Sequence, residues 1–191
     1  MATTAETTST DAARAMTYAD LEPLPEDISQ RHEIILGELF VSPSPVPNHQ
    51  FVLGNLFIRL YTHVAERRLG LVLMAPVDVK LSEYNVVVPD LLFVARDRLD
   101  IVAPKAIAGA PDLVVEILSP STARQDGIRK LALYATYGVR EYWLIDPDAK
   151  ALQVLTLVEG RYEPILGDGF PGSRILPDIQ IDLGALFADP G

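Results

Sequence analysis

Three runs dense in Val, Leu and Ile constrain the fold of this chain more than any other feature. They occupy residues 71–81, 86–94 and 112–118, and large aliphatic and β-branched side chains at this density favour β-strands. Strands that are apolar at almost every position are covered on both faces. The runs therefore predict a buried sheet at the centre of an α/β protein.

Two amphipathic helices are expected beside this sheet. Apolar residues recur at helical spacing between Asn48 and Leu69, with Asn48 as the N-cap and Gly70 as the stop. A second helix is expected from Asp126 to Tyr137, ending at Gly138. The helical spacing thus supplies one long helix before the apolar runs and a shorter one after them.

Hairpins are expected at both ends of this core. Residues 32–41 place two short apolar runs around Gly37, which suits a tight turn. A strand is expected at 141–147, a hairpin over 151–166 and a short closing element at 179–187. The order of elements predicts an α/β fold with a mixed β-sheet flanked by helices and with added β-hairpins.

The length and composition fit one globular domain. The chain has 191 residues, of which 49% are hydrophobic and 22% charged. Residues 1–16 lack apolar periodicity and are expected to form a flexible tail, which leaves 17–191 as the domain. No apolar run approaches the ~18 residues that span a bilayer, and the first residues lack the features of a signal peptide. A cytoplasmic protein with no membrane partner is expected.

The residue types present limit which metal sites and nucleophiles the chain can form. The absence of Cys excludes disulfides, thiolate zinc sites and a Cys nucleophile, and with only three His any metal is expected to be a hard ion held by oxygens. The net charge of −10 comes from the two ends, because residues 48–158 carry twelve basic and twelve acidic side chains. Non-specific coating of DNA is therefore not expected, whereas a local basic strip is compatible with the sequence.

Two carboxylates stand where the surrounding pattern predicts apolar residues. Asp90 interrupts VVVPDLLFV and Glu116 interrupts LVVEIL. Burying an unpaired charge is costly, so a counter-charge or a metal is expected. If the strands are neighbours, the two acids could share a Mg²⁺ ion. Alternatively both acids reach solvent at strand ends, with Pro89 marking a bend.

A lysine on the second helix is the third candidate. Lys130, Leu133, Tyr134 and Tyr137 share one helix face, so the ammonium of Lys130 could point into a cleft. The alternative is a lysine whose stem lies on apolar surface while its charge reaches water.

These features together resemble the PD-(D/E)XK nuclease superfamily. The more specific likeness is to the Uma-two family of restriction-endonuclease-like proteins, in the segments RHEIILGELFVSPSPVPNHQ, VVVPDLLFV, GAPDLVVEILSPST and RKLALYATYGVREYWLIDP. The resemblance covers Tyr18 to Leu186 and implies a restriction-endonuclease-like core. It also implies a Mg²⁺- or Mn²⁺-dependent endonuclease that hydrolyses phosphodiester bonds in DNA and acts as a homodimer.

The resemblance also implies roles for individual residues. Asp90 and Glu116 would be metal ligands, with the backbone carbonyl of Ile117 completing the protein's share. The superfamily places a lysine two residues after the second acid, where this chain has Leu118, and Lys130 matches the relocated lysine of the family. The catalytic set implied is therefore Asp90, Glu116 and Lys130.

Further residues are expected around this set. The family suggests that Glu33 and His49 approach the site, and Arg124, Arg129 and Arg140 are candidates for phosphate contacts or for solvated surface charges.

Two other functions stay open at this stage. One is a catalytically degenerate module of the nuclease fold that binds nucleic acid or protein, which the net acidity and Leu118 favour. The other is a glycoside hydrolase that uses the two acids, which lacks the exposed aromatic residues of a sugar cleft because Trp143, the only tryptophan, lies in an apolar strand.

Overall fold

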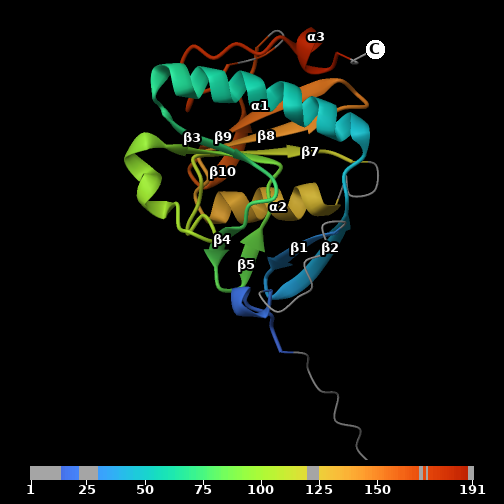
Figure 1. Ribbon diagram of the computed structural model, residues 1–191, viewed down its shortest axis with the longest axis vertical. Coiled ribbons are helices and arrows are strands. Elements are labelled where there is room, and N and C mark those ends of the chain that lie inside the picture. Colours follow the sequence, from blue (N-terminus) through green and yellow to red (C-terminus); the bar gives the residue numbers. More distant parts are fainter. Residues whose placement is uncertain (1–13, 22–29, 120–124, 168–169, 171, 189–191) are drawn as a thin grey trace, which may run out of the picture.

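Six strands form a central sheet in the computed structural model, which describes residues 14–21, 30–119, 125–167, 170 and 172–188 (Figure 1). The strand order is β10-β9-β8-β7-β6-β3. The strands are β3 (Gly70–Met74), β6 (Leu91–Ala95), β7 (Leu113–Ile117), β8 (Glu141–Asp146), β9 (Ala151–Val158) and β10 (Arg161–Pro164). β7 and β8 run parallel and the other neighbours antiparallel, which confirms the predicted mixed sheet.

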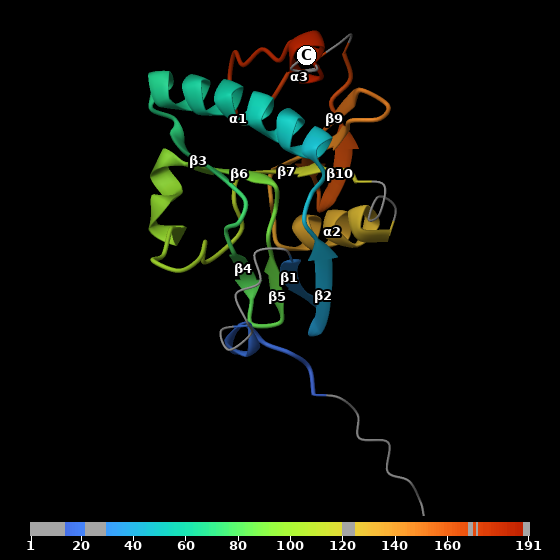
Figure 2. The same ribbon diagram turned by 45° about the vertical axis from the view of Figure 1, so that its right-hand side comes forward.

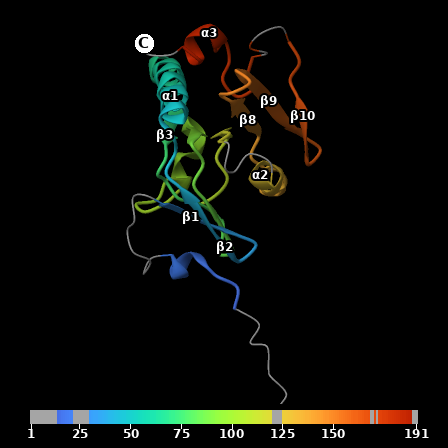
Figure 3. The same ribbon diagram turned by 90° about the vertical axis from the view of Figure 1, so that its right-hand side faces the viewer.

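One helix covers each face of this sheet (Figure 2). α1 (Pro47–Arg67) packs on one face, and its buried side chains join the odd-numbered apolar residues of β6 and β7. α2 (Gln125–Thr136) packs on the other face with the even-numbered residues of the same strands. Figure 3 shows both helices close to end-on, with strands of the sheet between them. Because α2 connects the parallel strands β7 and β8, it holds a fixed place beside the end of β7.

A second sheet, which the sequence did not predict, lies beyond α2 (Figure 1). Its order is β2-β1-β5-β4, and its strands are β1 (Gln30–Ile35), β2 (Glu38–Pro43), β4 (Val79–Ser82) and β5 (Asn85–Val87). It arises because two of the expected strands are each divided. The run 71–81 supplies β3 and β4, and the run 86–94 supplies β5 and β6, with one half in each sheet.

The division of the run 86–94 into β5 and β6 sets the position of Asp90. β5 ends at Val87 and β6 begins at Leu91, so Asp90 lies in the connection between the two sheets and not inside a continuous strand. Pro89 has no N–H to donate to a ladder, which suits this break. The acid is nevertheless only 2% exposed, so the alternative in which it reaches solvent at a strand end is wrong.

The expected ends of α1 need correction. The N-cap is Val46, with Asn48 inside the first turn, and the C-cap is Arg68 in a left-handed conformation with φ 54°. Gly70 begins β3 instead, where a Cβ atom would lie 2.0 Å from the carbonyl oxygen of Val94. This glycine therefore permits the close pairing of β3 with β6.

The remaining predicted elements are confirmed with small shifts. The hairpin around Gly37 is β1–β2, the hairpin over 151–166 is β9–β10, and the closing element contains the short helix α3 (Leu183–Leu186). Two short 3-10 helices were not predicted, η1 (Tyr18–Asp20) and η2 (Arg96–Ile101).

The two ends of the chain differ in what the structure describes. Residues 1–13 of the predicted tail lie outside the described residues, whereas the backbone N–H of Met16 donates to the carbonyl of Gly37 at 2.8 Å. Towards the C-terminus, the buried carboxylate of Glu141 accepts hydrogen bonds from the Ser173 hydroxyl and the Trp143 indole. Trp143 is fully buried, as expected for an apolar strand.

None of the helices in the described part of the chain is long and apolar enough to cross a membrane.

Candidate active site

A pocket of about 230 Å³ opens where the β1–β2 hairpin, the start of α1, the end of β7 and α2 meet. Six residues that the sequence singled out line it together: Glu33, His49, Asp90, Glu116, Ile117 and Lys130. The first two come from β1 and α1, and the others from the β5–β6 connection, from β7 and from α2. The expected convergence of these residues is confirmed, and their chemical roles stay predictions.

Asp90 is held by three donors. Arg31 donates to its Oδ1 at 2.9 Å, the backbone N–H of Ile117 donates to Oδ2 at 2.8 Å, and Nε2 of His49 lies 3.2 Å from Oδ2. Burial alone would raise the pKa of Asp90, but the hydrogen bond with His49 and the charge of Arg31 bring it below its ordinary value. Asp90 is therefore an ionised carboxylate in a buried place.

Glu116 has the opposite electrostatic setting. Burial is the main reason that its pKa is raised to about 7, and the nearby carboxylates of Asp90 and Glu33 raise it further. Lys130 and the hydroxyl of Tyr134, which donates to Oε1 at 2.7 Å, act in the other direction. Glu116 thus changes its protonation near neutral pH, as residues in active sites often do.

Lys130 bridges two carboxylates. Its Nζ lies 2.9 Å from Oε1 of Glu33 and 3.1 Å from Oε1 of Glu116. Burial would lower the pKa of Lys130, but the charges of Glu116 and Glu33 outweigh it and raise that pKa. The predicted proximity of Lys130 to Glu116 is confirmed, and the alternative of a lysine extended into water is wrong, because Lys130 is 6% exposed.

Glu33 also fixes the backbone around the site. Besides its ion pair with Lys130, its Oε1 accepts the backbone N–H of Val88 at 2.7 Å. This contact ties the hairpin to the segment that carries Asp90. Glu33 therefore links β1 to the β5–β6 connection and to α2 at the edge of the pocket.

Sequence reasoning missed Arg31, and it named Tyr134 only as a neighbour of Lys130 on the helix face and not as a member of the site. Arg31 stands two residues before Glu33 on β1 and so projects from the same face of the strand. Tyr134 stands four residues after Lys130 on α2, so the two side chains are neighbours on the helix surface. Both spacings can be read from the sequence once Glu33 and Lys130 are candidates for the site.

The arginines expected at phosphates are distributed differently. Arg124 lies outside the described residues. Arg129 is exposed and sits with its guanidinium carbon 5.0 Å from the centre of the Phe40 ring, beside the pocket rather than in its lining. Arg140 pairs with the fully buried Asp112 at the opposite end of β7, so its expected place near the cleft is wrong.

The donors in the pocket fit a hard divalent cation. In the described residues, no group of three or more His, Asp or Glu side chains is arranged to hold a metal ion. Mg²⁺ does not need such a group, because it binds through one or two carboxylates and keeps several waters. Asp90 and Glu116, with the carbonyl of Ile117, form a donor set of this kind in which all ligand atoms are oxygens.

The chain is similar to one protein family and to a solved structure. A family model described as "Uma2: Putative restriction endonuclease" matches residues 17–184. Among solved structures, the crystal structure of "a putative nuclease belonging to DUF820" from Anabaena variabilis ATCC 29413 matches with a TM-score of 0.75 and 22% identity, over 90% of this chain and 97% of that chain. The search of curated proteins gave no match. The structural match confirms the predicted nuclease-like fold.

Proposed function

The chain belongs to the Uma2 family of restriction-endonuclease-like proteins. We propose that it is a metal-dependent endonuclease that hydrolyses phosphodiester bonds in DNA. The observation that carries the proposal is the grouping of Asp90, Glu116 and Lys130 in one pocket, with Lys130 Nζ 3.1 Å from Glu116. Two acids and a lysine are the set that the resemblance to PD-(D/E)XK nucleases implies, and here they come from three separate segments.

Asp90, Glu116 and the carbonyl of Ile117 would hold Mg²⁺ or Mn²⁺. When bound, the ion polarises a phosphate oxygen and lowers the pKa of a bound water. Asp90 is suited to this task because its ionised form is already favoured, and Arg31 and His49 fix its orientation. Glu116 must lose its proton near neutral pH before it can act as a ligand.

Lys130 would stabilise negative charge in the transition state. Because its pKa is raised, it stays a cation and is not a general base. A buried cation held between Glu33 and Glu116 needs little reorganisation when charge develops on the phosphate nearby. The hydrogen bond from the Tyr134 hydroxyl keeps the Glu116 carboxylate oriented towards Lys130.

Phosphate contacts are proposed for Arg129, which lies outside the pocket lining, and for Arg124. A guanidinium is a suitable donor to phosphate oxygens, and such contacts position a nucleic acid without reading its sequence. Arg129 is exposed and adjoins Lys130 on α2, which supports this role.

We also propose that the protein acts as a homodimer, since cutting both strands of a duplex requires two sites. Exposed apolar side chains at Phe51, Ile58 and Tyr61 share the outer face of α1 and offer surface for such contact. The molar mass in solution, measured by light scattering, tests this: a single species at the monomer mass contradicts the proposal.

The second candidate function is a module of the same fold that binds nucleic acid or protein without cleaving it. Leu118 favours it, because this apolar residue lines the pocket where the superfamily has its lysine. The net charge of −10 favours it as well. Calorimetric titration with Mn²⁺ separates the two functions, since the module should be indifferent to the ion.

A cleavage assay tests the proposed function directly. Duplex DNA, single-stranded DNA and RNA are incubated with the wild type in Mg²⁺, in Mn²⁺ and in EDTA, beside Glu116→Gln and the exposed control Glu163→Gln. We expect metal-dependent cleavage by the wild type and the control, and none by Glu116→Gln. Equal cleavage by all three proteins would reveal a contaminating nuclease, and no cleavage of any substrate would overturn the proposal.

A further inference from the structure

A second hollow lies beside the candidate active site, between the β1–β2 hairpin and α2. Its volume is about 480 Å³. The walls include the apolar side chains of Ile35, Phe40, Leu133 and Tyr137, and two charged residues, Glu38 and Arg129, border it. A concave apolar space with a few polar groups is the usual form of a ligand site.

The two hollows are consecutive along the same structural elements. Glu33 lies opposite Phe40 in the β1–β2 register, so both side chains project from the ribbon face that meets α2. Arg129 precedes Lys130 on α2. The Arg129–Phe40 contact therefore adjoins the ion pair between Glu33 and Lys130.

The spacing between the hollows fits a polynucleotide. Glu33 lines the pocket of the candidate active site, and Ile35 lines the second hollow. The two residues are two positions apart on β1, which corresponds to about 7 Å along the strand. A phosphate in the active site would thus place the neighbouring nucleotide at the second hollow. In a duplex, however, bases stay stacked about 3.4 Å apart along each strand, so a base must be unpaired to enter.

We propose that this hollow is a nucleobase subsite, which takes an unpaired base of the substrate strand next to the phosphate to be cleaved. The Arg129 guanidinium, held over the Phe40 ring, offers a flat cation on which a base can stack and N–H groups that can donate to phosphate. The Glu38 carboxylate can accept a hydrogen bond from an exocyclic amino group. The inference rests on the proposed function and adds a preference for single-stranded or locally unpaired nucleic acid.

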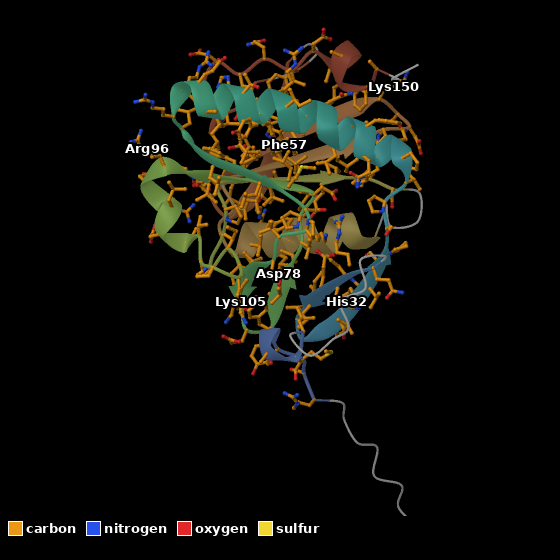
Figure 4. The ribbon with its side chains drawn as sticks, in the orientation of Figure 1. His32, Phe57, Asp78, Arg96, Lys105 and Lys150 are labelled. Atoms are coloured by element: carbon orange, nitrogen blue, oxygen red, sulfur yellow. The ribbon has the colours of Figure 1, made fainter. Side chains whose placement is uncertain are left out.

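The charge of the protein makes such a subsite useful. With a net charge of −10, phosphate contacts alone supply little affinity. Figure 4 shows Arg96, Lys105 and Lys150 at widely separated places on the periphery, so these cations form no common track for a backbone. Stacking of a base is independent of net charge and tolerates any sequence.

Binding without cleavage tests the subsite. In EDTA, the wild type is titrated with a 12-nucleotide single strand, with its duplex, and with single strands that carry one abasic position at each place in turn. We expect tighter binding of the single strand than of the duplex, and a roughly ten-fold loss of affinity at one abasic position. A 2-aminopurine at that position should change its fluorescence on binding.

Two variants connect this loss to the hollow. Phe40→Leu keeps apolar packing and removes the ring, and Arg129→Gln removes an exposed guanidinium. Both variants should bind the intact single strand about as weakly as the wild type binds the strand with the critical abasic position. Introducing that abasic position should then cause no further loss of affinity in either variant. Arg161→Gln, an exposed arginine on β10, serves as the control and should bind like the wild type.

The possible results separate the subsite from the enzyme activity. If the wild type cleaves nucleic acid with metal but abasic positions and both variants leave affinity unchanged, the subsite is wrong and the proposed function stands. If Arg161→Gln loses as much affinity as Arg129→Gln, general charge explains the effect and the subsite is again wrong. If the wild type neither binds nor cleaves any nucleic acid, both proposals fail.

Discussion

The carboxylate of Asp90 accepts the backbone N–H of Ile117 at 2.8 Å. This hydrogen bond joins the β5–β6 connection to β7 at the residue that follows Glu116. The two acids are therefore held together by the backbone of β7 itself, independently of any ion. The two acids nevertheless differ in what their loss would do to the fold.

Replacement of Asp90 by Asn should destabilise the protein. Asp90 is 2% exposed and compensates the charge of Arg31, so Asp90→Asn leaves a largely buried guanidinium without its ionised partner. Breaking a buried ion pair in this way costs about 3 kcal/mol. Urea unfolding in EDTA measures the change, and an unfolding free energy equal to that of the wild type would contradict the structural role of Asp90.

Replacement of Glu116 by Gln should have the opposite sign in the metal-free protein. Because the folded-state pKa of Glu116 is raised from 4.5 to about 7, its ionisation costs stability as pH rises through this interval, and the cost is constant above it. Glu116→Gln should thus be nearly neutral at pH 4.5 and stabilising by up to about 3 kcal/mol at pH 8. The measurement is thermal unfolding at both pH values with Glu163→Gln as the control, and a uniform effect of pH on all three proteins would contradict the raised pKa.

The members of the site also show what the sequence could and could not reveal. Asp90 and Glu116 were found because an acid in an apolar run requires compensation, and Lys130 because helical spacing placed it on an inward face. Arg31 was missed because its partner depends on the second sheet. That sheet forms because the runs 71–81 and 86–94 change sheets midway, and strand propensity carries no information about which sheet a segment joins.

Replacement of Lys130 by Met should separate binding from catalysis. Met keeps much of the length of Lys and removes the charge, so metal binding should persist while cleavage falls by about two orders of magnitude, equivalent to about 2.7 kcal/mol in the transition state. Single-turnover cleavage at saturating Mn²⁺, beside calorimetric titration of the ion, measures both. Cleavage at the wild-type rate would show that Lys130 has no catalytic role.

Divalent ions should stabilise the wild type against unfolding. At a concentration 100 times its Kd, an ion that binds only the folded state adds about 2.7 kcal/mol. The effect should be larger at pH 8 than at pH 6, because Glu116, with its pKa of about 7, is then ionised before the ion binds. The shift in melting temperature with Mn²⁺ measures this, and Glu116→Gln should show little shift; a full shift in that variant would place the ion elsewhere.

The helices and the β9–β10 hairpin were predictable for a different reason. Their patterns are local, since the period of the apolar residues and the turn residues specify each one without its partners. The caps of α1 show the limit of such reasoning. Asn48 is a good N-cap residue, but Pro47 suits the first helical position, so the N-cap lies two residues earlier, at Val46.

The way the pocket is held together bears on the order in which the chain folds. Its contacts join residues far apart in sequence: Asp90 with His49 across 41 positions, Val88 with Glu33 across 55, and Asp90 with Arg31 across 59. Contacts with long loops are entropically expensive to close and accumulate late in folding. We therefore expect the arrangement of Asp90, Glu116 and Lys130 to appear only when both sheets have docked, so that a newly made, half-folded chain would lack the proposed cleavage activity.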